Sequence, residues 1–214
     1  MERRARGRPP AGDPTTLSTE HLLDAALEAF AELGYEGTSV REIARKLGVS
    51  HNLIPQRIGS KDVLWRRAVD QGFGRLMLQL LTALEDDPED DVERLRAVVT
   101  KFVEANAARP ALVRVIAKEA VIAGDRFDYL FDNYIEPVRI MGVELLGRLR
   151  GSGRLRTDSV ALLYFFMTHG AGGSAALPGL AQRFGSQVDP DDAVAVRRHA
   201  EEAVEVLFRG LLAD

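Results

Sequence analysis

The fold of this chain is best predicted from residues 40–61, which read V-R-E-I-A-R-K-L-G-V-S-H-N-L-I-P-Q-R-I-G-S-K. Its first part carries apolar residues at helical spacing, namely Val40, Ile43, Ala44 and Leu47. Gly48 then suits the left-handed turn that ends a helix, and Val49 supplies an apolar plug between two helices. The pattern predicts a helix-turn-helix, a motif that lays its short second helix in the major groove of DNA.

Serine residues mark the expected beginning of both helices in this motif. Ser39 and Glu42 form the S-x-x-E pattern of a capping box at the first helix. Ser50 is placed to cap the second helix. The buried side of the second helix is expected to consist of Leu53, Ile54 and Ile58.

The segments on both sides of this motif narrow the interpretation. Residues 25–39 read A-A-L-E-A-F-A-E-L-G-Y-E-G-T-S, and residues 59–65 read G-S-K-D-V-L-W. The run from residue 19 to residue 69 closely resembles the DNA-binding domain of the TetR family of bacterial transcriptional regulators. The resemblance implies a ligand-responsive regulator, more commonly a repressor, that binds a near-palindromic operator as a homodimer and is released by a small-molecule effector.

Two residues of the second helix depart from the pattern of this family. Ile58 stands where the family usually has Phe, which keeps an apolar plug of smaller volume. Pro55 stands where the family usually has a Tyr that touches the DNA backbone. Proline lacks a backbone donor and crowds the preceding turn, at about 3 kcal/mol in an ordinary helix interior, so we expect a recognition helix that is short, kinked or partly 3₁₀. The alternative function is a helical binding or adaptor protein that has lost sequence-specific DNA recognition.

Polar side chains in and around the motif are the candidate DNA contacts. The resemblance places four residues near the phosphate backbone: Thr38, Arg41, Ser60 and Lys61. Because the family's Tyr is absent, we expect four other residues of this segment to make more of the contacts with DNA: His51, Asn52, Gln56 and Arg57. The two cap positions, Ser39 and Ser50, complete the set within the motif.

The N-terminal arm, residues 1–18, is basic and proline-rich, and we expect it to be disordered in isolation. Its sequence Arg6-Gly7-Arg8-Pro9 resembles the core of an AT-hook. In that interpretation Arg6 and Arg8 enter a narrow A·T minor groove, where the negative potential is strongest. A soluble tail without a DNA contact is the alternative.

The 214 residues suffice for one larger domain or two small domains with a proper core, and the absence of cysteine excludes a disulfide framework. The net charge is −4, but it is unevenly distributed. Residues 1–67 hold 11 Lys+Arg and 9 Asp+Glu, and the remainder holds 17 and 23, so the candidate DNA-binding end is mildly basic. No secretory signal pattern is present, and the longest uncharged stretch, residues 159–182, is interrupted by four glycines and Pro178. We expect a cytoplasmic protein without a membrane span.

Signals for catalysis or metal binding are weak. No G-x-S-x-G, H-E-x-x-H, P-loop or G-x-G-x-x-G pattern occurs. His199 and Glu202 are spaced for one helical face but have no further ligand near them in sequence. The acidic residues 86–91 lack the residue order of a calcium loop. We therefore expect neither an enzyme nor a bound metal or cofactor.

The rest of the chain is predicted to be helical. Apolar periodicity indicates further helices over residues 62–85, 92–108, 110–123, 126–150, 158–176 and 190–212. Gly124 is expected to end one of them and Pro137 to bend the next. The predicted fold is all-α with about nine helices. It comprises the basic arm (1–18), a three-helix DNA-binding domain (19–66) and a helical effector-binding and dimerisation domain (67–214).

The last two predicted helices are the expected dimer interface. Small residues in the first of them allow another helix to approach closely: Gly170, Ala171, Gly172, Gly173, Ala175 and Ala176. The final helix carries a partly apolar stripe formed by Val194, Val196, Ala203, Val204, Leu207, Phe208 and Leu211. An ordinary core within one chain is the alternative.

Aromatic and methionine residues of the C-terminal part are candidate effector contacts, because relatives sense small molecules there. The candidates are Phe73, Met77, Phe102, Val103, Ile116, Phe127, Tyr134, Met141, Phe165, Phe166 and His169. Together they predict an apolar effector, with Tyr134 and His169 as the polar groups that orient it. Each one alone is more typical of a core position, and His169 in particular is typical of a satisfied core histidine.

Overall fold

The computed structural model describes residues 17–85, 90–185 and 188–213. Within these ranges the regular secondary structure is helical, and one isolated bridge pairs Leu155 with Leu212. The all-α prediction is confirmed. The chain forms two compact units that divide between Gln71 and Gly72, close to the boundary predicted after residue 66.

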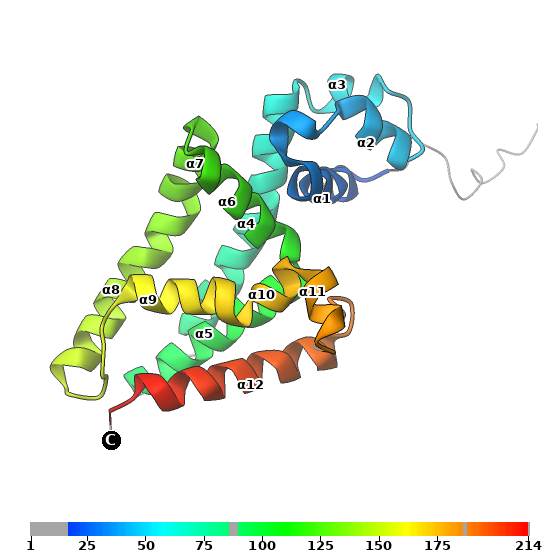
Figure 1. The fold of residues 1–214 in the computed structure, drawn as a ribbon. Coiled ribbons are helices and arrows are strands. Elements are labelled where there is room, and N and C mark those ends of the chain that lie inside the picture. Colours follow the sequence, from blue (N-terminus) through cyan, green and yellow to red (C-terminus); the bar gives the residue numbers. More distant parts are fainter. Residues whose placement is uncertain (1–16, 86–89, 186–187, 214) are drawn as a thin grey trace, which may run out of the picture. The chain divides into compact units, whose positions relative to one another are not determined.

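The first unit consists of α1 (Thr19–Gly37), α2 (Val40–Lys46), α3 (Leu53–Arg57) and the first turns of α4 (Lys61–Glu85), as Figure 1 shows. Ser18 caps α1, because its hydroxyl accepts the backbone N–H of His21 at 3.1 Å. One apolar core joins these helices: Leu22, Leu23, Ala26, Leu27, Phe30, Ile43, Ala44, Ile54, Leu64, Trp65, Ala68 and Val69 are buried. Trp65 is the largest of its fully buried side chains.

The turn between α2 and α3 has the predicted glycine geometry but differs in its caps. Gly48 has φ of 66°, and the N–H of Val49 donates to the carbonyl of Ala44 at 3.0 Å. Ser39 occupies the N-cap position of α2, yet its side chain makes no capping hydrogen bond, so the predicted capping box is wrong. Regular α3 begins at Leu53 rather than directly after Ser50, whose hydroxyl accepts the N–H of Asn52 at 3.4 Å.

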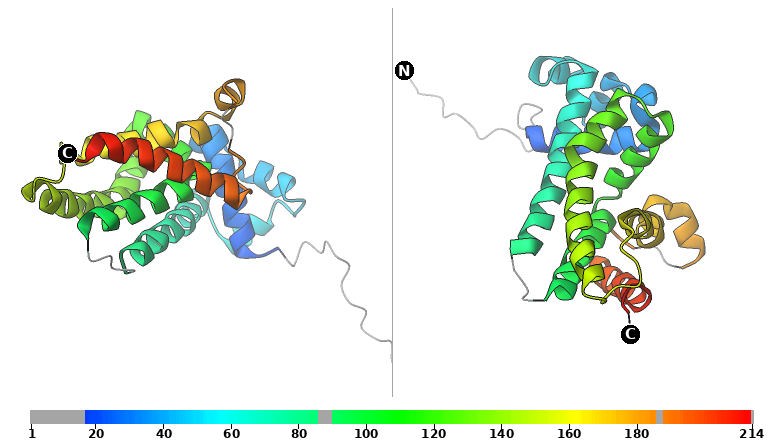
Figure 2. Two further views of the ribbon diagram at one scale, coloured as in Figure 1. Left: turned by 90° about the horizontal axis from the view of Figure 1, so that it is seen from below. Right: turned by 90° about the vertical axis from the view of Figure 1, so that its left-hand side faces the viewer.

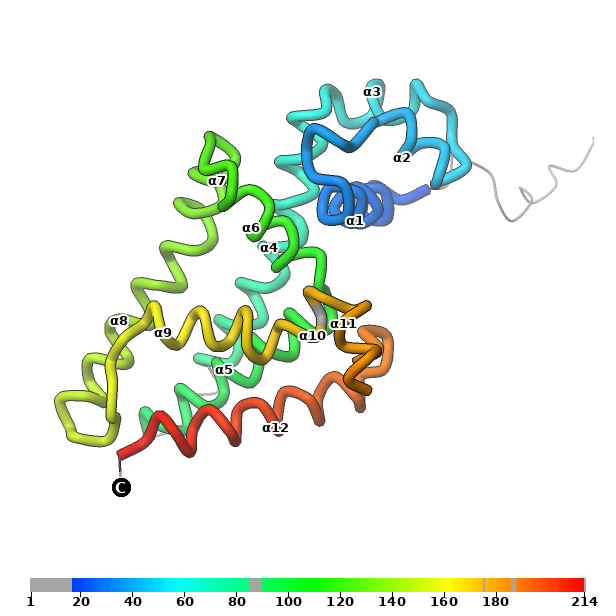
Figure 3. Tube along the Cα trace, viewed as in Figure 1, coloured from blue at the N-terminus to red at the C-terminus, as the bar shows by residue number. Residues whose placement is uncertain are grey.

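The second unit contains the rest of α4 and all later helices (Figures 2 and 3). In chain order these are α5 (Asp91–Ala108), α6 (Pro110–Ile122), α7 (Asp125–Leu130), η2 (Phe131–Ile135), α8 (Glu136–Gly151), α9 (Val160–Phe165), η3 (Phe166–Ala171), α10 (Gly173–Ala176), α11 (Pro178–Arg183) and α12 (Ala193–Leu211). The sequence did not predict α11. Ala123, with φ of 52°, takes the left-handed cap of α6 that was expected at Gly124.

Two π turns, η2 and η3, interrupt the long helices of this unit. In η2 the N–H of Glu136 bonds to the carbonyl of Phe131, and Pro137 follows directly. The proline therefore sits just after a turn with i→i+5 bonding, which is how the helix accommodates its missing donor. In η3 the N–H of Gly172 donates to the carbonyl of Met167 at 2.9 Å.

Helix α12 packs along α5, and this packing divides the predicted dimer stripe. Within the single chain, five residues of α12 are buried: Val196, Ala200, Val204, Phe208 and Leu211. Arg96 of α5 lies over the Phe208 ring, at 4.4 Å from its centroid. Val194 of the stripe, in contrast, is 78% exposed, and Val206, which is not part of the predicted stripe, is 71% exposed. Part of the stripe is thus intramolecular core, and part remains on the surface.

Membrane crossing demands a longer and more apolar helix than any found in the part of the chain that the structure describes.

Candidate DNA-binding surface and ligand cavity

Helix α3 is short, as Pro55 led us to expect, and it is anchored by its apolar side. It spans five residues, with Ile54 fully buried and Ile58, which follows it, 8% exposed. The N–H groups on both sides of the proline are bonded: that of Gln56 donates to Asn52 at 3.0 Å, and that of Ile58 to Ile54 at 2.8 Å. A single missing donor is therefore accommodated in a helix of little more than one turn.

The opposite side of this segment is polar and exposed. His51, Asn52, Gln56 and Arg57 all lie there, together with Pro55. The Arg57 guanidinium donates to the backbone carbonyl of Leu17, the first described residue. Arg6 and Arg8, the other candidate arginines, lie outside the described residues. The exposed face of α3 thus offers amide, imidazole and guanidinium groups, which are the groups that read base edges and phosphates.

The residues that the family pattern places near phosphate, together with the two cap serines, fall into two groups. Ser39, Arg41, Ser50 and Ser60 are exposed and Lys61 is half-buried. Ser60 accepts the N–H of Val63 at 3.3 Å at the beginning of α4, and the Lys61 ammonium lies 4.4 Å from the centroid of the Tyr35 ring. Thr38 differs, because only 3% of it is exposed.

The buried side chain of Thr38 has a structural role at the end of α1. Its hydroxyl lies 2.6 Å from the carbonyl of Gly34 and 3.1 Å from that of Ala29. Gly34 has φ of 74° and interrupts the helical course of α1. The threonine hydroxyl therefore supplies a donor where the end of α1 leaves carbonyls without helical partners.

Replacing Thr38 by Val should lower the free energy of unfolding by about 1–2 kcal/mol, because a buried carbonyl loses its donor while the side-chain shape is kept. Thr38→Ser, which retains the hydroxyl, is the matched control and should lose less. Urea denaturation followed by circular dichroism measures both variants. Equal stability of Thr38→Val and the parent protein would show that the hydroxyl is not needed.

The second unit encloses a cavity of about 850 Å³, within the range typical of small-molecule sites. Its wall comes from α4, α5, α6, α7, η2, α8, α9 and η3, and it is mainly apolar. Nine of the candidate effector contacts lie in this wall: Phe73, Met77, Phe102, Ile116, Phe127, Tyr134, Met141, Phe165 and His169. The Phe73 and Tyr134 rings stack there with centroids 5.1 Å apart.

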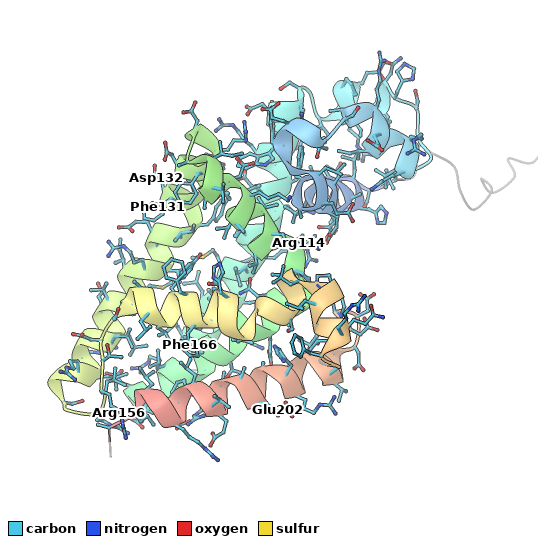
Figure 4. All side chains as sticks on the ribbon, viewed as in Figure 1. Arg114, Phe131, Asp132, Arg156, Phe166 and Glu202 are labelled. Carbon is cyan, nitrogen blue, oxygen red and sulfur yellow. The ribbon has the colours of Figure 1, made fainter. Side chains whose placement is uncertain are left out.

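Two candidates are placed elsewhere. Phe166 and Val103 line a smaller hollow of about 340 Å³ beside α12. Phe166 is 53% exposed, and Figure 4 shows it on the side of η3 that faces α12. The physical reason is that Phe165 and Phe166 are neighbours in a helix, where successive side chains point about 100° apart, so the two rings face different sides.

Several polar residues of the cavity wall were not predicted. Arg94, Asn106, Arg139, Glu144, Arg148, Tyr164 and Thr168 all line it. Arg148 binds Asp91 at 2.9 and 3.1 Å, and these hydrogen bonds hold the pKa of Asp91 below its usual value. Arg139 is likewise paired with Glu136, so these two wall arginines are already matched by carboxylates. Burial raises the pKa of Tyr164, which keeps its hydroxyl protonated.

In the described part of the chain, no group of three or more potential metal ligands comes together. His199 instead lies with Nε2 at 2.8 Å from the carbonyl of Ala171. A helix-turn-helix with an exposed polar face, in a chain whose other unit holds an apolar cavity, defines a DNA-binding regulator of the ligand-responsive class.

Comparison with known proteins agrees with this class. The sequence model of the family described as "Bacterial regulatory proteins, tetR family" matches residues 22–68. The HTH-type transcriptional repressor KstR2 of Rhodococcus jostii (strain RHA1) is 31% identical over 194 residues, which cover 82% of this chain and 92% of that protein. The chain belongs to the TetR family of bacterial regulatory proteins, and it is a DNA-binding transcriptional regulator rather than an enzyme.

Solved structures share its fold. The ketosteroid transcriptional regulator KstR2 of Mycobacterium tuberculosis superposes with a TM-score of 0.72 at 22% identity, covering 92% of this chain and 96% of that one. AibR, solved in complex with isovaleryl coenzyme A and operator DNA, superposes with a TM-score of 0.61 at 21% identity, covering 88% and 97%. The all-helical architecture is therefore that of TetR-type regulators.

Proposed function

We propose that the protein is a repressor that binds a near-palindromic operator as a homodimer and leaves it when an apolar small molecule fills the cavity. The observation that carries the DNA part is the two-sided geometry of α3. Ile54 and Ile58 are buried in the core, so Asn52 and Gln56 are held on the exposed face. A short helix fixed in this way presents its polar side chains to base edges in a major groove.

Two copies are needed because one short helix reads too few base pairs. Twofold symmetry places two recognition helices on successive major grooves, and the operator then mirrors that symmetry. Apolar side chains between α9 and α12 support an interface there, since eight of them are more than half exposed in the single chain: Leu162, Phe165, Phe166, Leu177, Leu180, Phe184, Val194 and Val206. Exposed apolar surface of this extent is typical of protein interfaces.

The cavity supports the effector part of the proposal. Its volume suits a molecule of drug or metabolite size, and its wall is mainly aliphatic and aromatic. Helix α4 contributes Trp65 to the core of the first unit and Phe73 to the cavity wall. An effector that prefers a position of α4 incompatible with operator binding lowers DNA affinity, and by linkage the operator lowers effector affinity by the same factor. As a regulator of bacterial transcription, the protein acts in the cytoplasm.

Selection on randomised duplex DNA tests the operator proposal. The protein should enrich an inverted repeat, and analytical ultracentrifugation should show two chains per enriched site. Weak, salt-sensitive binding without any enriched sequence would instead favour a helical binding protein that has lost operator recognition.

Substitutions at Lys61 and Gln56 should separate phosphate contacts from base contacts. Lys61→Ala should weaken binding to the enriched site and to random DNA alike. It should also reduce by about one the slope of the logarithm of the binding constant against the logarithm of the salt concentration. Gln56→Ala should weaken binding to the enriched site by about 1–3 kcal/mol and leave random DNA unaffected. Titrations at two salt concentrations measure both. If the two variants behave identically on both DNAs, the assignment of these roles is wrong.

A further inference from the structure

One aromatic side chain of the DNA-binding unit, that of Tyr35, is held in place at the end of α1. Its ring stacks on the ring of Phe30, with centroids 5.9 Å apart and an angle of 11° between the ring planes. Phe30 is only 1% exposed, so this contact joins the half-buried tyrosine to the core of the unit. Stacked aromatic pairs at such distances are favourable beyond the area that they bury.

Thr38 fixes the backbone on both sides of this tyrosine. The Thr38 hydroxyl lies 2.6 Å from the carbonyl of Gly34, and the Thr38 N–H donates to the carbonyl of Tyr35 at 3.2 Å. Gly34 has φ of 74° and interrupts the helical course of α1 directly before Tyr35. Both the backbone and the ring of Tyr35 are therefore restrained.

The ammonium group of Lys61 lies against this restrained ring, with Nζ 4.4 Å from the Tyr35 centroid. Distances below about 6 Å are typical of cation–π interactions. Lys61 is the first residue of α4, where a helix favours negative rather than positive charge. Across residues 17–85, 90–185 and 188–213, Lys61 takes part in no ion pair, whereas the adjacent Asp62 is paired with Arg66 at 3.1 Å. An aromatic ring, rather than a carboxylate, thus holds this ammonium group.

The difference between a ring and a carboxylate matters for a lysine that meets phosphate. A carboxylate would neutralise the ammonium group, and a phosphate would have to displace it. An aromatic face carries no net charge, so Lys61 keeps its full charge and can donate hydrogen bonds on the side away from the ring. A lysine that is already held also loses less rotamer freedom when it binds.

We propose that Tyr35 is a positioning residue for DNA binding, whose ring orients the Lys61 ammonium group toward a phosphate of the duplex. Tyr35 acts through Lys61 and needs no contact of its own with DNA. Phosphates carry no sequence information, so the effect is the same on any duplex. The inference rests on the phosphate contact proposed for Lys61 and adds what orients that lysine.

Proton–carbon NMR spectra of the free protein test the contact. Hydrogens above an aromatic ring resonate upfield, so the ε-methylene protons of Lys61 should lie upfield of those of the other lysines, which are Lys46, Lys101 and Lys118. The spectrum of Lys61→Ala assigns the signal. The upfield shift should persist in Tyr35→Phe and vanish in Tyr35→Leu. A Lys61 signal at the position of the other three in the parent protein would overturn the proposal.

Fluorescence anisotropy with a labelled DNA duplex of random sequence measures the effect on binding. Tyr35→Leu should weaken binding about threefold for each chain, and so about tenfold for a dimer, the factor that corresponds to an exposed cation–π interaction. Tyr35→Phe keeps the ring and lacks the hydroxyl, so it should bind as the parent does. If Tyr35→Phe binds as weakly as Tyr35→Leu, the hydroxyl rather than the ring is needed and the proposal fails.

A double-mutant cycle separates positioning from a general loss of structure. In a Lys61→Ala background, Tyr35→Leu should have no further effect on DNA affinity, because the ring then has no ammonium group to hold. Circular dichroism checks that each variant keeps its helical content. An equal loss of affinity in both backgrounds would mean that the substitution acts through the fold, and it would reject the positioning role.

This inference and the operator proposal can fail separately. An upfield Lys61 signal and weaker binding by Tyr35→Leu, without any enriched operator, would keep the role of the ring and reject operator recognition. An enriched inverted repeat together with unchanged DNA affinity of Tyr35→Leu would do the reverse. No binding of the parent protein to any duplex would overturn both.

Discussion

Replacing Trp65 by Ala should lower the free energy of unfolding of the DNA-binding unit by about 4 kcal/mol and abolish operator binding. Trp65 is fully buried in the core that α1, α2, α3 and the beginning of α4 share. Removing an indole leaves a large void in this small core, and the lost contacts add to the lost transfer free energy. Because typical domains are stable by only 5–15 kcal/mol, the loss takes away much of the stability that positions α3.

Urea denaturation followed by circular dichroism measures this change, since the variant has no tryptophan left for fluorescence. Trp65→Phe is the control, and it should lose less stability because an aromatic ring remains. Fluorescence anisotropy with labelled operator then compares DNA affinity. A Trp65→Ala protein with the stability and DNA affinity of the parent would contradict the central place of this side chain.

Replacing Arg126 by Met should destabilise the second unit by about 3 kcal/mol, because it leaves a buried carboxylate without its charged partner. The Arg126 guanidinium lies 3.1 Å from Glu119, whose side chain is only 4% exposed. The arginine itself is 22% exposed, so water softens the loss and the lower end of the usual range applies. Thermal unfolding monitored by circular dichroism measures it.

The same substitution in a Glu119→Gln background is the matched comparison. The amide carries no charge, so replacing Arg126 there should lower the stability of the second unit clearly less than in the parent protein. The difference between the two costs is the coupling free energy of the pair. Identical costs in both backgrounds would show that the ion pair contributes nothing to stability.

The sequence predicted the fold wherever regular periodicity and a strong local motif coincide. Helix α5 begins and ends within one residue of the predicted range, because its apolar residues keep the helical spacing and Asp90 and Pro110 mark its ends. The glycine turn at Gly48 and the buried side of α3 were predicted for the same reason. Such features depend on residues close together in the chain.

What the sequence could not predict depends on contacts distant in the chain or on irregular backbone. Thr38 matches a family position near DNA, but its burial results from the break of α1 at Gly34 and from a contact with Ala29. Cavity residues such as Asn106 and Arg148 face inward because of how the helices pack.

Helix α11 was missed for a different reason. Pro178 and Gly179 are typical loop residues, but proline also fits the first position of a helix, where its absent N–H has no partner to lose. The helix is only one and a half turns long, too short for apolar periodicity to reveal it.

The π turn η3 has a consequence for how ligand preference can change during evolution. A π turn contains one residue more than the α-helical turn it replaces. Deleting a single residue between Phe166 and Ala171 would restore a regular helix, so the helix beyond it would keep its register while the side chains within the turn would change their angles around the axis. A different set of side chains would then face the cavity without any substitution. Segment length, as well as residue identity, therefore determines the lining of this site, and an alignment that ignores one-residue gaps here would compare residues that face different ways.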